Sequence, residues 1–276
     1  MQYWIPIASL GLRKKPLLIT TEHNTHNRRR NYKILRLLER FIYYLYDKVI
    51  SITPETEKNL LRWLKIKKSE KYQVIINGVN LDKFNQAIPA KLDRFLGIEV
   101  KPEDKFLLMV ARFDEQKDHE TVFKAMRILP SNIKLILIGE GELEDHYKKL
   151  AINYKISERV FFLGKRSDVP EITKSVDVCI LSSNWEGFGL VVVEAMAAGK
   201  PVIASRVPGL ENVVGDAGIL FEKGNYKELA NAILNVLNNE KLYKSLCIKG
   251  LLYSEKFSIN KMVEEYLKVY NNLAKS

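Results

Sequence analysis

The fold of this chain is decided around residues 186–194, which read Glu-Gly-Phe-Gly-Leu-Val-Val-Val-Glu. A strand-like apolar run, Val176–Leu181, precedes this stretch. The residues after it have the pattern of a helix that ends on a C-cap glycine, Gly199. Glu186 and Glu194 therefore straddle a predicted turn from a strand into a helix.

Such a turn is suited to binding two kinds of chemical group. Free backbone N–H groups and the positive end of the helix dipole attract anions, and the glycines allow a ligand to come close to the backbone. The two carboxylates would repel phosphate, but they can accept hydrogen bonds from hydroxyl groups. Phosphate beside vicinal hydroxyls is the chemistry of a nucleotide-sugar, which the sequence therefore predicts as the ligand.

Length and composition are typical of two modest α/β domains. The chain has 276 residues, of which 46% are apolar, so it can form sizeable cores. Its only cysteines, Cys179 and Cys247, fit a reducing compartment. No apolar run has membrane-spanning length and no signal peptide is recognisable. We expect a cytoplasmic protein, either free or peripheral at the inner membrane face.

The net charge of +11 is concentrated in the first third of the chain. Residues 1–95 contain 19 Lys and Arg against 8 Asp and Glu, whereas residues 96–276 contain 25 of each kind. No nucleic-acid-binding motif accompanies this charge, so we expect no nucleic-acid partner. An anionic membrane surface or a phosphorylated lipid suits it better.

One group of these cations has helical spacing. Steps of four, three and four residues separate Arg29, Lys33, Arg36 and Arg40. On a helix these four residues would form a single basic stripe, which could dock on an anionic bilayer. The helix predicted in this region covers about Tyr32–Leu45. The alternative is a solvated helix face over an ordinary core.

The second part of the chain alternates between predicted strands and helices. The strands are Phe106–Ala111, Lys134–Ile138, Val160–Leu163, Val176–Leu181, Pro201–Ala204 and Gly218–Phe221. The helices include Thr121–Leu129, Leu143–Tyr154, Val191–Ala198 and Lys227–Asn238. This βαβ rhythm predicts a doubly wound parallel sheet that binds ligands at the carboxyl ends of its strands.

The first part contains fewer elements of the same kind. Strands are predicted at Leu17–Thr20, Val49–Thr53 and Val74–Ile76, with a helix from Pro54 to about Leu64. We expect three segments: a partial domain over residues 1–95, a ligand-binding domain over residues 96–257, and a C-terminal helix in residues 258–276.

Two cations follow the first strand of the second part. Arg112 ends this strand and Lys117 lies five residues further on. Facing the glycine turn before Leu190, they could neutralise a diphosphate, since Arg offers a planar fork and Lys a point charge. The alternative is a pair of solvated loop charges. Gly139 and Gly141 follow the next strand, where they either contact the ligand or form an ordinary turn.

His23 follows the first strand of the chain, where a parallel sheet exposes functional side chains. It either contacts a sugar hydroxyl or is a polar loop residue. The other histidines, His26, His119 and His146, have no metal-ligand partners at useful spacing, so no metal site is predicted.

Several of these motifs occur together in a known family. The defining one is Glu-x7-Glu, formed here by Glu186 and Glu194. It is accompanied by Asn77-Gly78-Val79-Asn80 before Phe84, Val110-Ala111-Arg112 with Lys117, Gly139-Glu140-Gly141 and Pro208-Gly209-Leu210-Glu211. With these motifs the chain resembles the retaining glycosyltransferases of family 4, also called glycosyl transferases group 1. The resemblance spans most of residues 17–240.

The resemblance implies a fold and a set of roles. The fold class is α/β, of the GT-B type, with two Rossmann-like parallel-sheet domains of which the N-terminal one is incomplete. By resemblance, Arg112 and Lys117 grip the donor diphosphate, and Glu194 accepts hydrogen bonds from the ribose. Glu186 and His23 serve the transferred sugar as catalytic residues. Donor contacts are further implied for Gly139, Gly141, Phe188, Gly189 and Leu190.

The implied reaction is sugar transfer with retention of configuration. The leaving phosphate itself can accept the proton of the acceptor, and the cationic pair stabilises its developing charge. No metal or other cofactor is expected. The donor is a nucleotide-diphosphate sugar, and the acceptor is a saccharide or lipid-linked acceptor. Residues 21–30 resemble those of enzymes that assemble capsular or extracellular polysaccharide.

The chain departs from the family at its beginning. Members start with a strand, a glycine-rich loop and further βα units before the segment that matches Gln2–Leu10. We therefore expect an N-terminally truncated enzyme or a partner chain that supplies the missing half. The alternatives are a non-catalytic donor-binding fragment or subunit of a split glycosyltransferase, and a nucleotide-sugar epimerase of the same fold.

Overall fold

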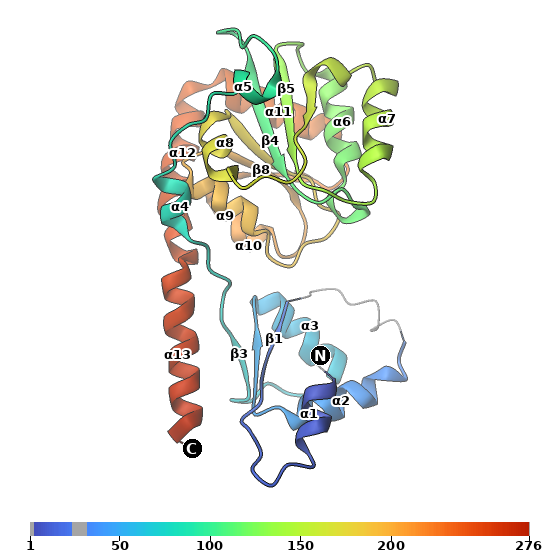
Figure 1. The fold of residues 1–276 in the computed structure, drawn as a ribbon, viewed down its shortest axis with the longest axis vertical. Coiled ribbons are helices and arrows are strands. Elements are labelled where there is room, and N and C mark those ends of the chain that lie inside the picture. Colours follow the sequence, from blue (N-terminus) through green and yellow to red (C-terminus); the bar gives the residue numbers. More distant parts are fainter. Residues whose placement is uncertain (1–2, 24–31, 276) are drawn as a thin grey trace. The chain divides into compact units, whose positions relative to one another are not determined.

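A computed structural model of the protein describes residues 3–23 and 32–275. The chain divides into two compact units. Unit 1 comprises residues 1–78 and 259–276, and unit 2 comprises residues 79–258. Each unit is an α/β layer structure (Figure 1), which confirms the predicted fold class.

Unit 2 is built on a six-stranded parallel sheet. Its strands are β4 (Lys105–Val110), β5 (Ile133–Ile138), β6 (Val160–Phe162), β7 (Val178–Leu181), β8 (Val202–Arg206) and β9 (Ile219–Glu222). Their spatial order is β6-β5-β4-β7-β8-β9, so the chain reverses direction across the sheet between β4 and β7. This is the doubly wound order of the Rossmann fold, whose ligands bind at that reversal point.

Helices cover both faces of this sheet (Figure 1). Helices α6 (His119–Ile128), α7 (Glu144–Asn153) and α11 (Tyr226–Asn238) lie on one face. Helices α8 (Val169–Ser175), α9 (Leu190–Ala197) and α12 (Glu240–Ser254) lie on the other. Shorter helices are α4 (Leu81–Asn85), α5 (Asp93–Leu96) and α10 (Glu211–Val214).

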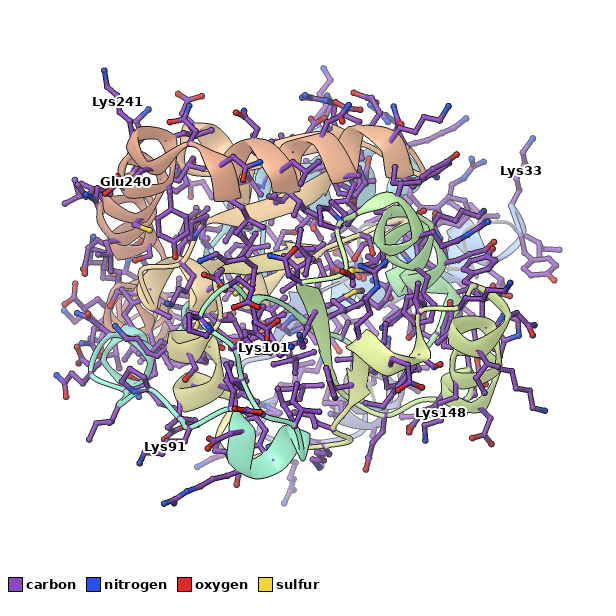
Figure 2. The ribbon with its side chains drawn as sticks, turned by 90° about the horizontal axis from the view of Figure 1, so that it is seen from above. Lys33, Lys91, Lys101, Lys148, Glu240 and Lys241 are labelled. Atoms are coloured by element: carbon purple, nitrogen blue, oxygen red, sulfur yellow. The ribbon has the colours of Figure 1, made fainter. Side chains whose placement is uncertain are left out.

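The core of unit 2 lies along the central strands, whose side chains are buried on both faces. Leu107, Leu135, Leu137 and Ile203 have no exposed surface. Such continuous apolar runs are expected where helices cover both faces of a parallel sheet. Long charged side chains, including Lys101, Lys148 and Lys241, project from the surface instead (Figure 2).

Helix α9 begins and ends at glycines, and the one at its end is the predicted C-cap glycine. Gly189 is its N-cap, with a left-handed φ of 81°. At the other end the N–H of Gly199 donates to Met196 O, and the N–H of Lys200 donates to Ala195 O. These two bonds form a Schellman motif around the left-handed Gly199.

Unit 1 has a three-stranded parallel sheet in the order β1-β2-β3. The strands are β1 (Ile19–Glu22), β2 (Lys48–Ser51) and β3 (Tyr72–Val74). Its helices are α1 (Trp4–Ser9), α2 (Leu35–Leu45), α3 (Pro54–Leu64) and α13 (Ile259–Lys275). None of the helices in the described residues is long and apolar enough to cross a membrane.

Two apolar clusters hold unit 1 together. Ile42 of α2 and Leu60 of α3 pack in one cluster with Val49 of β2. In the other, Val269 of α13 packs against Ile50 and Ile75. The C-terminal helix is therefore part of unit 1, although in the sequence all residues of unit 2 lie between it and the rest of unit 1.

The structure corrects the predicted end of the first domain from residue 95 to residue 78. Residues 79–95 belong to unit 2 because α4 packs on α8 and α9. Ala90 reinforces this, since its N–H donates to Glu171 O and its carbonyl accepts from the Ser175 hydroxyl.

The predicted basic helix is also shorter than expected. Helix α2 begins at Leu35, not near Tyr32, and its N-cap Ile34 makes no side-chain capping bond. Lys33 therefore precedes the helix, and Arg29 lies outside the described residues. Strand β1 begins two residues later than predicted because its pairing with β2 starts at Ile19.

Candidate functional site

The candidate residues of unit 2 gather at the reversal point of the sheet. Strands β4 and β7 are direct neighbours and run parallel, so the loops that follow them emerge at the same edge. Arg112 and Lys117 lie in the loop after β4, and Glu186 lies in the loop after β7. The sequence places these loops far apart, and the sheet brings them together.

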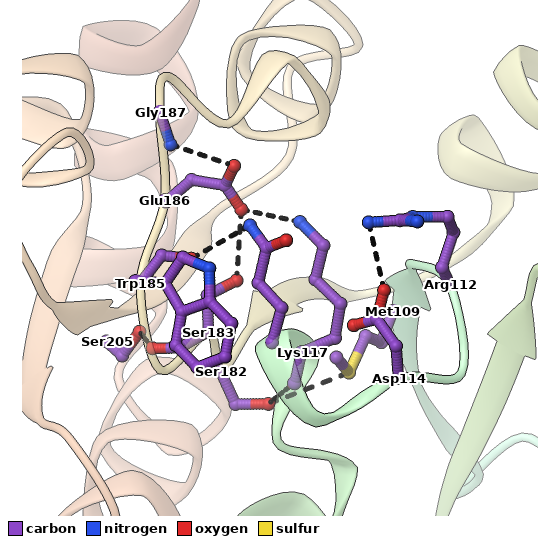
Figure 3. Close-up of polar contacts among 11 residues, drawn as sticks. Met109, Arg112, Asp114, Lys117, Ser182, Ser183, Trp185, Glu186, Gly187 and Ser205 are labelled. Atoms are coloured by element: carbon purple, nitrogen blue, oxygen red, sulfur yellow. Dashed lines mark hydrogen bonds and ion pairs between the residues drawn. The ribbon is translucent and has the colours of Figure 1, made fainter. Parts of the chain in front are cut away.

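Lys117 and Glu186 form an ion pair across the two loops. The Lys117 Nζ to Glu186 Oε2 distance is 2.5 Å, and only 14% and 11% of the two side chains are exposed. The same Oε2 accepts a hydrogen bond from the Ser183 hydroxyl at 3.1 Å. Oε1 accepts from the N–H of Gly187 at 3.1 Å (Figure 3). The prediction that Lys117 faces the Glu186 loop is confirmed.

Arg112 is held differently. Its guanidinium pairs with Asp114 of the same loop at 2.9 Å, and 70% of the side chain is exposed (Figure 3). It makes no recorded bond to the β7–α9 loop, so the two predicted cations do not share a partner. A surface ion pair contributes little to the free energy of folding. Arg112 can therefore leave Asp114 and bind a ligand at a small cost in free energy.

Glu194 is a partly buried carboxylate without a partner. It lies in α9, eight residues after Glu186, and in the described residues it has neither a hydrogen bond nor an ion pair. Burial raises the pKa of this carboxyl group, and Lys83 of α4 opposes that rise. A cavity of about 20 Å³ reaches it, with space for about one water molecule.

The turn into α9 presents its backbone rather than its side chains. In the part of the chain that the structure describes, the N–H groups of Gly189 and Leu190 have no recorded acceptor. Unpaired N–H groups at the start of a helix form an anion site. The Phe188 ring, by contrast, is buried against Phe257 with ring centres 5.6 Å apart, so its side chain belongs to the core.

Gly139 and Gly141 are explained by close backbone packing. A Cβ on Gly139 would lie 2.0 Å from the carbonyl oxygen of Ala111, and one on Gly141 would lie 2.4 Å from that of Phe113. Only glycine lets the loop after β5 approach the loop after β4 this closely. Their predicted contact with a donor stays a prediction.

His23 lies in a different unit from the other candidates. It directly follows β1 in unit 1 and is exposed, whereas all the other site residues belong to unit 2. Its predicted catalytic role stays a prediction.

Sequence reasoning missed the hydrogen bonds that fix the loops. The buried Ser182 hydroxyl lies 3.0 Å from both the Lys117 and the Asp118 carbonyl oxygens. Asn184 donates from its N–H to Gln116 O at 2.7 Å and from its amide to Glu115 O at 2.8 Å. The three consecutive polar residues from Ser182 to Asn184, directly after a buried strand, were the available signal.

The end of β8 and the loop that follows it also contact the loop that carries Glu186. The Ser205 hydroxyl, at the end of β8, donates to Ser183 O at 2.7 Å. Gly209 lies so close that a Cβ on it would be 2.3 Å from the carbonyl oxygen of Glu186. Both contacts hold the loop that carries Glu186 against β8 and the loop that follows β8.

In the described ranges, no three His, Cys, Asp or Glu side chains are grouped so that they could hold a metal ion. Independence from metals stays a prediction, as does the assignment of each residue to a role.

Two family profiles match this chain. Glycosyl transferases group 1 matches residues 94–250, and Glycosyltransferase Family 4 matches residues 1–83. The first of these covers more than half of the chain and contains the whole candidate site of unit 2.

Individual relatives are glycosyltransferases. One of Methanocaldococcus jannaschii, uncharacterized, is 34% identical over 83% of this chain and 60% of its own length. One of Haemophilus influenzae, also uncharacterized, is 31% identical over 94% of this chain and 70% of its own. The UDP-Gal:alpha-D-GlcNAc-diphosphoundecaprenol alpha-1,3-galactosyltransferase of Escherichia coli is 31% identical over 62% of this chain and 46% of its own. The chain thus spans about half to two thirds of the length of most such relatives.

Solved structures share the fold. Anabaena HepE, in complex with UDP and glucose, superposes with a TM-score of 0.85 at 22% identity, over 98% of this chain and 76% of HepE. Sucrose-phosphate synthase of Thermosynechococcus elongatus gives 0.83 at 27% identity, over 99% and 72%. Profiles, relatives and fold agree, and the chain belongs to glycosyl transferases group 1, the GT-B glycosyltransferases of family 4.

Proposed function

We propose that the chain is a retaining glycosyltransferase that uses a nucleotide-diphosphate sugar. It transfers the sugar to a saccharide or lipid-linked acceptor in the synthesis of surface polysaccharide. Membership of the glycosyltransferase family supports the transfer of a sugar as the general reaction. The donor class, the retention of configuration and the acceptor are parts of the proposal.

One observation carries the donor assignment. A cation, a carboxylate and unpaired backbone N–H groups come together at the reversal point of the sheet of unit 2. Lys117 suits the diphosphate, Glu186 suits a sugar hydroxyl, and the N–H groups of the turn suit phosphate oxygens. The Glu194 carboxylate, which has no hydrogen bond or ion pair among the described residues, is ready to accept hydrogen bonds from the ribose.

The same groups support the proposed reaction. As the bond to the leaving diphosphate breaks, negative charge grows on its oxygens, where Lys117, Arg112 and the start of α9 stabilise it. The leaving oxygen then takes the proton of the acceptor hydroxyl on the same face of the sugar, which gives retention. Lys117 exchanges its partner in this scheme, from Glu186 in the free protein to the diphosphate in the complex.

Relatives support the choice of acceptor. The E. coli relative acts on a saccharide diphosphoundecaprenol, and HepE has been solved with UDP and glucose. A lipid-linked acceptor requires a protein that works at a membrane, which the net charge of +11 favours.

Calorimetry with nucleotide-sugars tests the donor site. A thermal-shift screen would first choose the ligand, with UDP-glucose as the first probe. Replacing Arg112 with alanine should weaken binding of the diphosphate sugar by about tenfold and that of the free nucleoside much less. Equal losses for both ligands would contradict the assignment.

Arg166→Ala is the matched control for this experiment. Arg166 also pairs with an aspartate two residues on, Asp168, at 2.7 Å, but it follows β6, outside the site. Its replacement should leave both affinities unchanged. Retention itself is tested by the anomeric configuration of the product in NMR.

The three-stranded sheet of unit 1 favours a second candidate. Against the six strands of unit 2, unit 1 offers a small surface for an acceptor. The alternative is a donor-binding subunit that needs a second chain for catalysis. Donor binding without transfer to any lipid-linked acceptor, followed by activity on addition of the partner, would support it.

A further inference from the structure

Trp185 is an exposed aromatic side chain within the candidate site. It directly precedes Glu186 in the loop after β7, and 42% of its surface is exposed. Two other aromatic residues lie in the loops that follow β4 and β7, and both are buried. Phe113 has no exposed surface and Phe188 has 3%. Trp185 is therefore the aromatic ring that these two loops leave open to a ligand.

The loop presents this ring on an ordered backbone. The carbonyl oxygen of Trp185 accepts a hydrogen bond from Gln116 Nε2 at 3.0 Å (Figure 3). The N–H of Asn184, on one side, donates to Gln116 O at 2.7 Å. On the other side the Glu186 carboxylate is paired with Lys117. Because the backbone is already held, the ring loses little conformational entropy when it packs against a ligand.

The order of the site groups along the chain indicates which part of the ligand Trp185 meets. This step rests on the proposed function, in which Glu194 binds the ribose and Glu186 binds the sugar, with the turn between them on the diphosphate. Trp185 lies beyond Glu186 in this series. It therefore belongs to the sugar end of the donor and not to the ribose or the base.

The chemistry of an indole face fits a sugar ring. A pyranose carries its hydroxyl groups around its rim and C–H groups on its faces. The face of an aromatic ring is negative, so it attracts polarised C–H groups and repels phosphate oxygens. Leu190, at the other end of the turn, is 39% exposed and adds a second apolar side chain. The turn thus offers polar groups between apolar ones, as small-molecule sites do.

We propose that the indole face of Trp185 packs against the C–H face of the pyranose that the nucleotide-sugar donor carries. Glu186 then binds a hydroxyl on the rim of the sugar, while Trp185 contacts the face of the ring. Together the two neighbouring residues fix both the position and the tilt of the sugar. Trp185 recognises the sugar and contributes little to binding of the nucleotide.

Paired ligands that differ only in the sugar test the proposal. The pairs are UDP with UDP-glucose and GDP with GDP-mannose, measured by calorimetry on the full chain. In the pair that binds, Trp185→Ala should weaken the nucleotide-sugar about tenfold and the nucleotide less than about twofold. Trp185→Phe keeps an aromatic face and should recover most of the lost affinity.

Tryptophan fluorescence gives a second readout of the same contact. The chain has three tryptophans, of which Trp4 and Trp63 lie in unit 1 and Trp185 lies in unit 2. A sugar that covers the indole removes water from it. The nucleotide-sugar should therefore move the emission to shorter wavelength, whereas the nucleotide alone should not. Trp185→Phe should abolish this shift.

Trp4→Ala is the matched control. Trp4 is 75% exposed and lies on α1 of unit 1, outside the candidate site of unit 2. Its replacement should leave both affinities and the size of the emission shift unchanged. Thermal melts check that each variant folds.

Two results would overturn the proposal. One is a Trp185→Ala variant that weakens the nucleotide and the nucleotide-sugar equally, or neither, which a structural role would produce. The other is a nucleotide-sugar that binds and leaves the emission unchanged. Either can occur while Arg112→Ala still weakens the diphosphate ligands, and the proposed donor site then stands. A chain that binds neither pair of ligands would refute the donor assignment and this inference together.

Discussion

Glu194 combines a stability cost with a proposed binding role. Because burial raises its pKa, the folded protein binds a proton at this site more tightly than the unfolded chain does. Stability contributed by this site therefore falls as the pH rises from the ordinary carboxyl value through the raised value. At neutral pH the ionised group destabilises the empty protein.

We therefore expect Glu194→Gln to raise the melting temperature by about 2 °C at neutral pH. The same change should weaken donor binding by about tenfold or more, since an amide is a weaker acceptor for ribose hydroxyls than a carboxylate. Differential scanning fluorimetry and calorimetry measure the two effects. The exposed Glu158→Gln serves as control, and a variant that is both less stable and normal in binding would contradict this account.

At the scale of residues, the sequence predicts the chemistry of the site better than its contacts. Glu186 and Lys117 were found because a carboxylate and a cation each follow an apolar strand. The pairing of Arg112 with Asp114 and the bonds of Ser182 depend on where two loops meet in space, which local pattern does not encode. For His119 the sequence predicted only that it has no metal-ligand partners at useful spacing, and its full burial between aromatic rings was not foreseen.

At the scale of elements, the loop after β7 holds the loop after β4 through the Ser182 hydroxyl. Ser182→Ala should cost about 1 kcal/mol of unfolding free energy and should also weaken donor binding, because the Lys117 turn loses its support. Ser254→Ala is the control, since this buried hydroxyl donates to Leu251 O at 2.7 Å in α12. Ser254→Ala should lower the free energy of unfolding in urea by a similar amount and leave the affinity for the donor unchanged.

The tight approach of the β5 and β4 loops gives a second prediction at this scale. Gly139→Ala should destabilise unit 2 by more than about 3 kcal/mol, because its Cβ would collide with the backbone of Ala111. Gly164 also has a left-handed φ but has open space around it, so Gly164→Ala should cost only about 1 kcal/mol. Chemical unfolding of the two variants compares them, and similar costs would contradict the packing role of Gly139.

Most strands and helices of unit 2 were predictable from the sequence. The strands are continuous apolar runs, and in the helices the apolar residues recur at helical spacing. Helix α3 was predicted to its first residue, since Thr53 caps it and Pro54 occupies its first position. The start of α2 was not, because no capping residue marks it. The strands of unit 1 shifted by up to two residues, since register is set by pairing and not by the run of apolar side chains.

At the scale of the molecule, His119 should govern acid unfolding of unit 2. Burial, with a smaller contribution from Lys117, lowers the pKa of His119 to about 3. The unfolded chain therefore binds a proton that the folded chain rejects, and stability falls as the pH drops below about 6.5. The loss should reach roughly 3 kcal/mol by about pH 4.

His119→Leu should flatten this part of the pH dependence. Neither ring nitrogen of His119 has a hydrogen-bond partner in the part of the chain that the structure describes, so no such bond is lost. Urea unfolding across the acid range measures the difference from the unaltered protein. The exposed His146→Gln should follow the original profile, and a His119→Leu profile that does the same would contradict the prediction.

The order of the units along the chain has a consequence for synthesis. Unit 2 is one continuous run, whereas unit 1 is divided, and Val269 from its last helix covers Ile50 and Ile75. During translation the ribosome completes unit 2 before that helix emerges. One side of the sheet of unit 1 therefore stays uncovered until α13 leaves the exit tunnel, and we expect the nascent chain to bind chaperones that shield apolar surface.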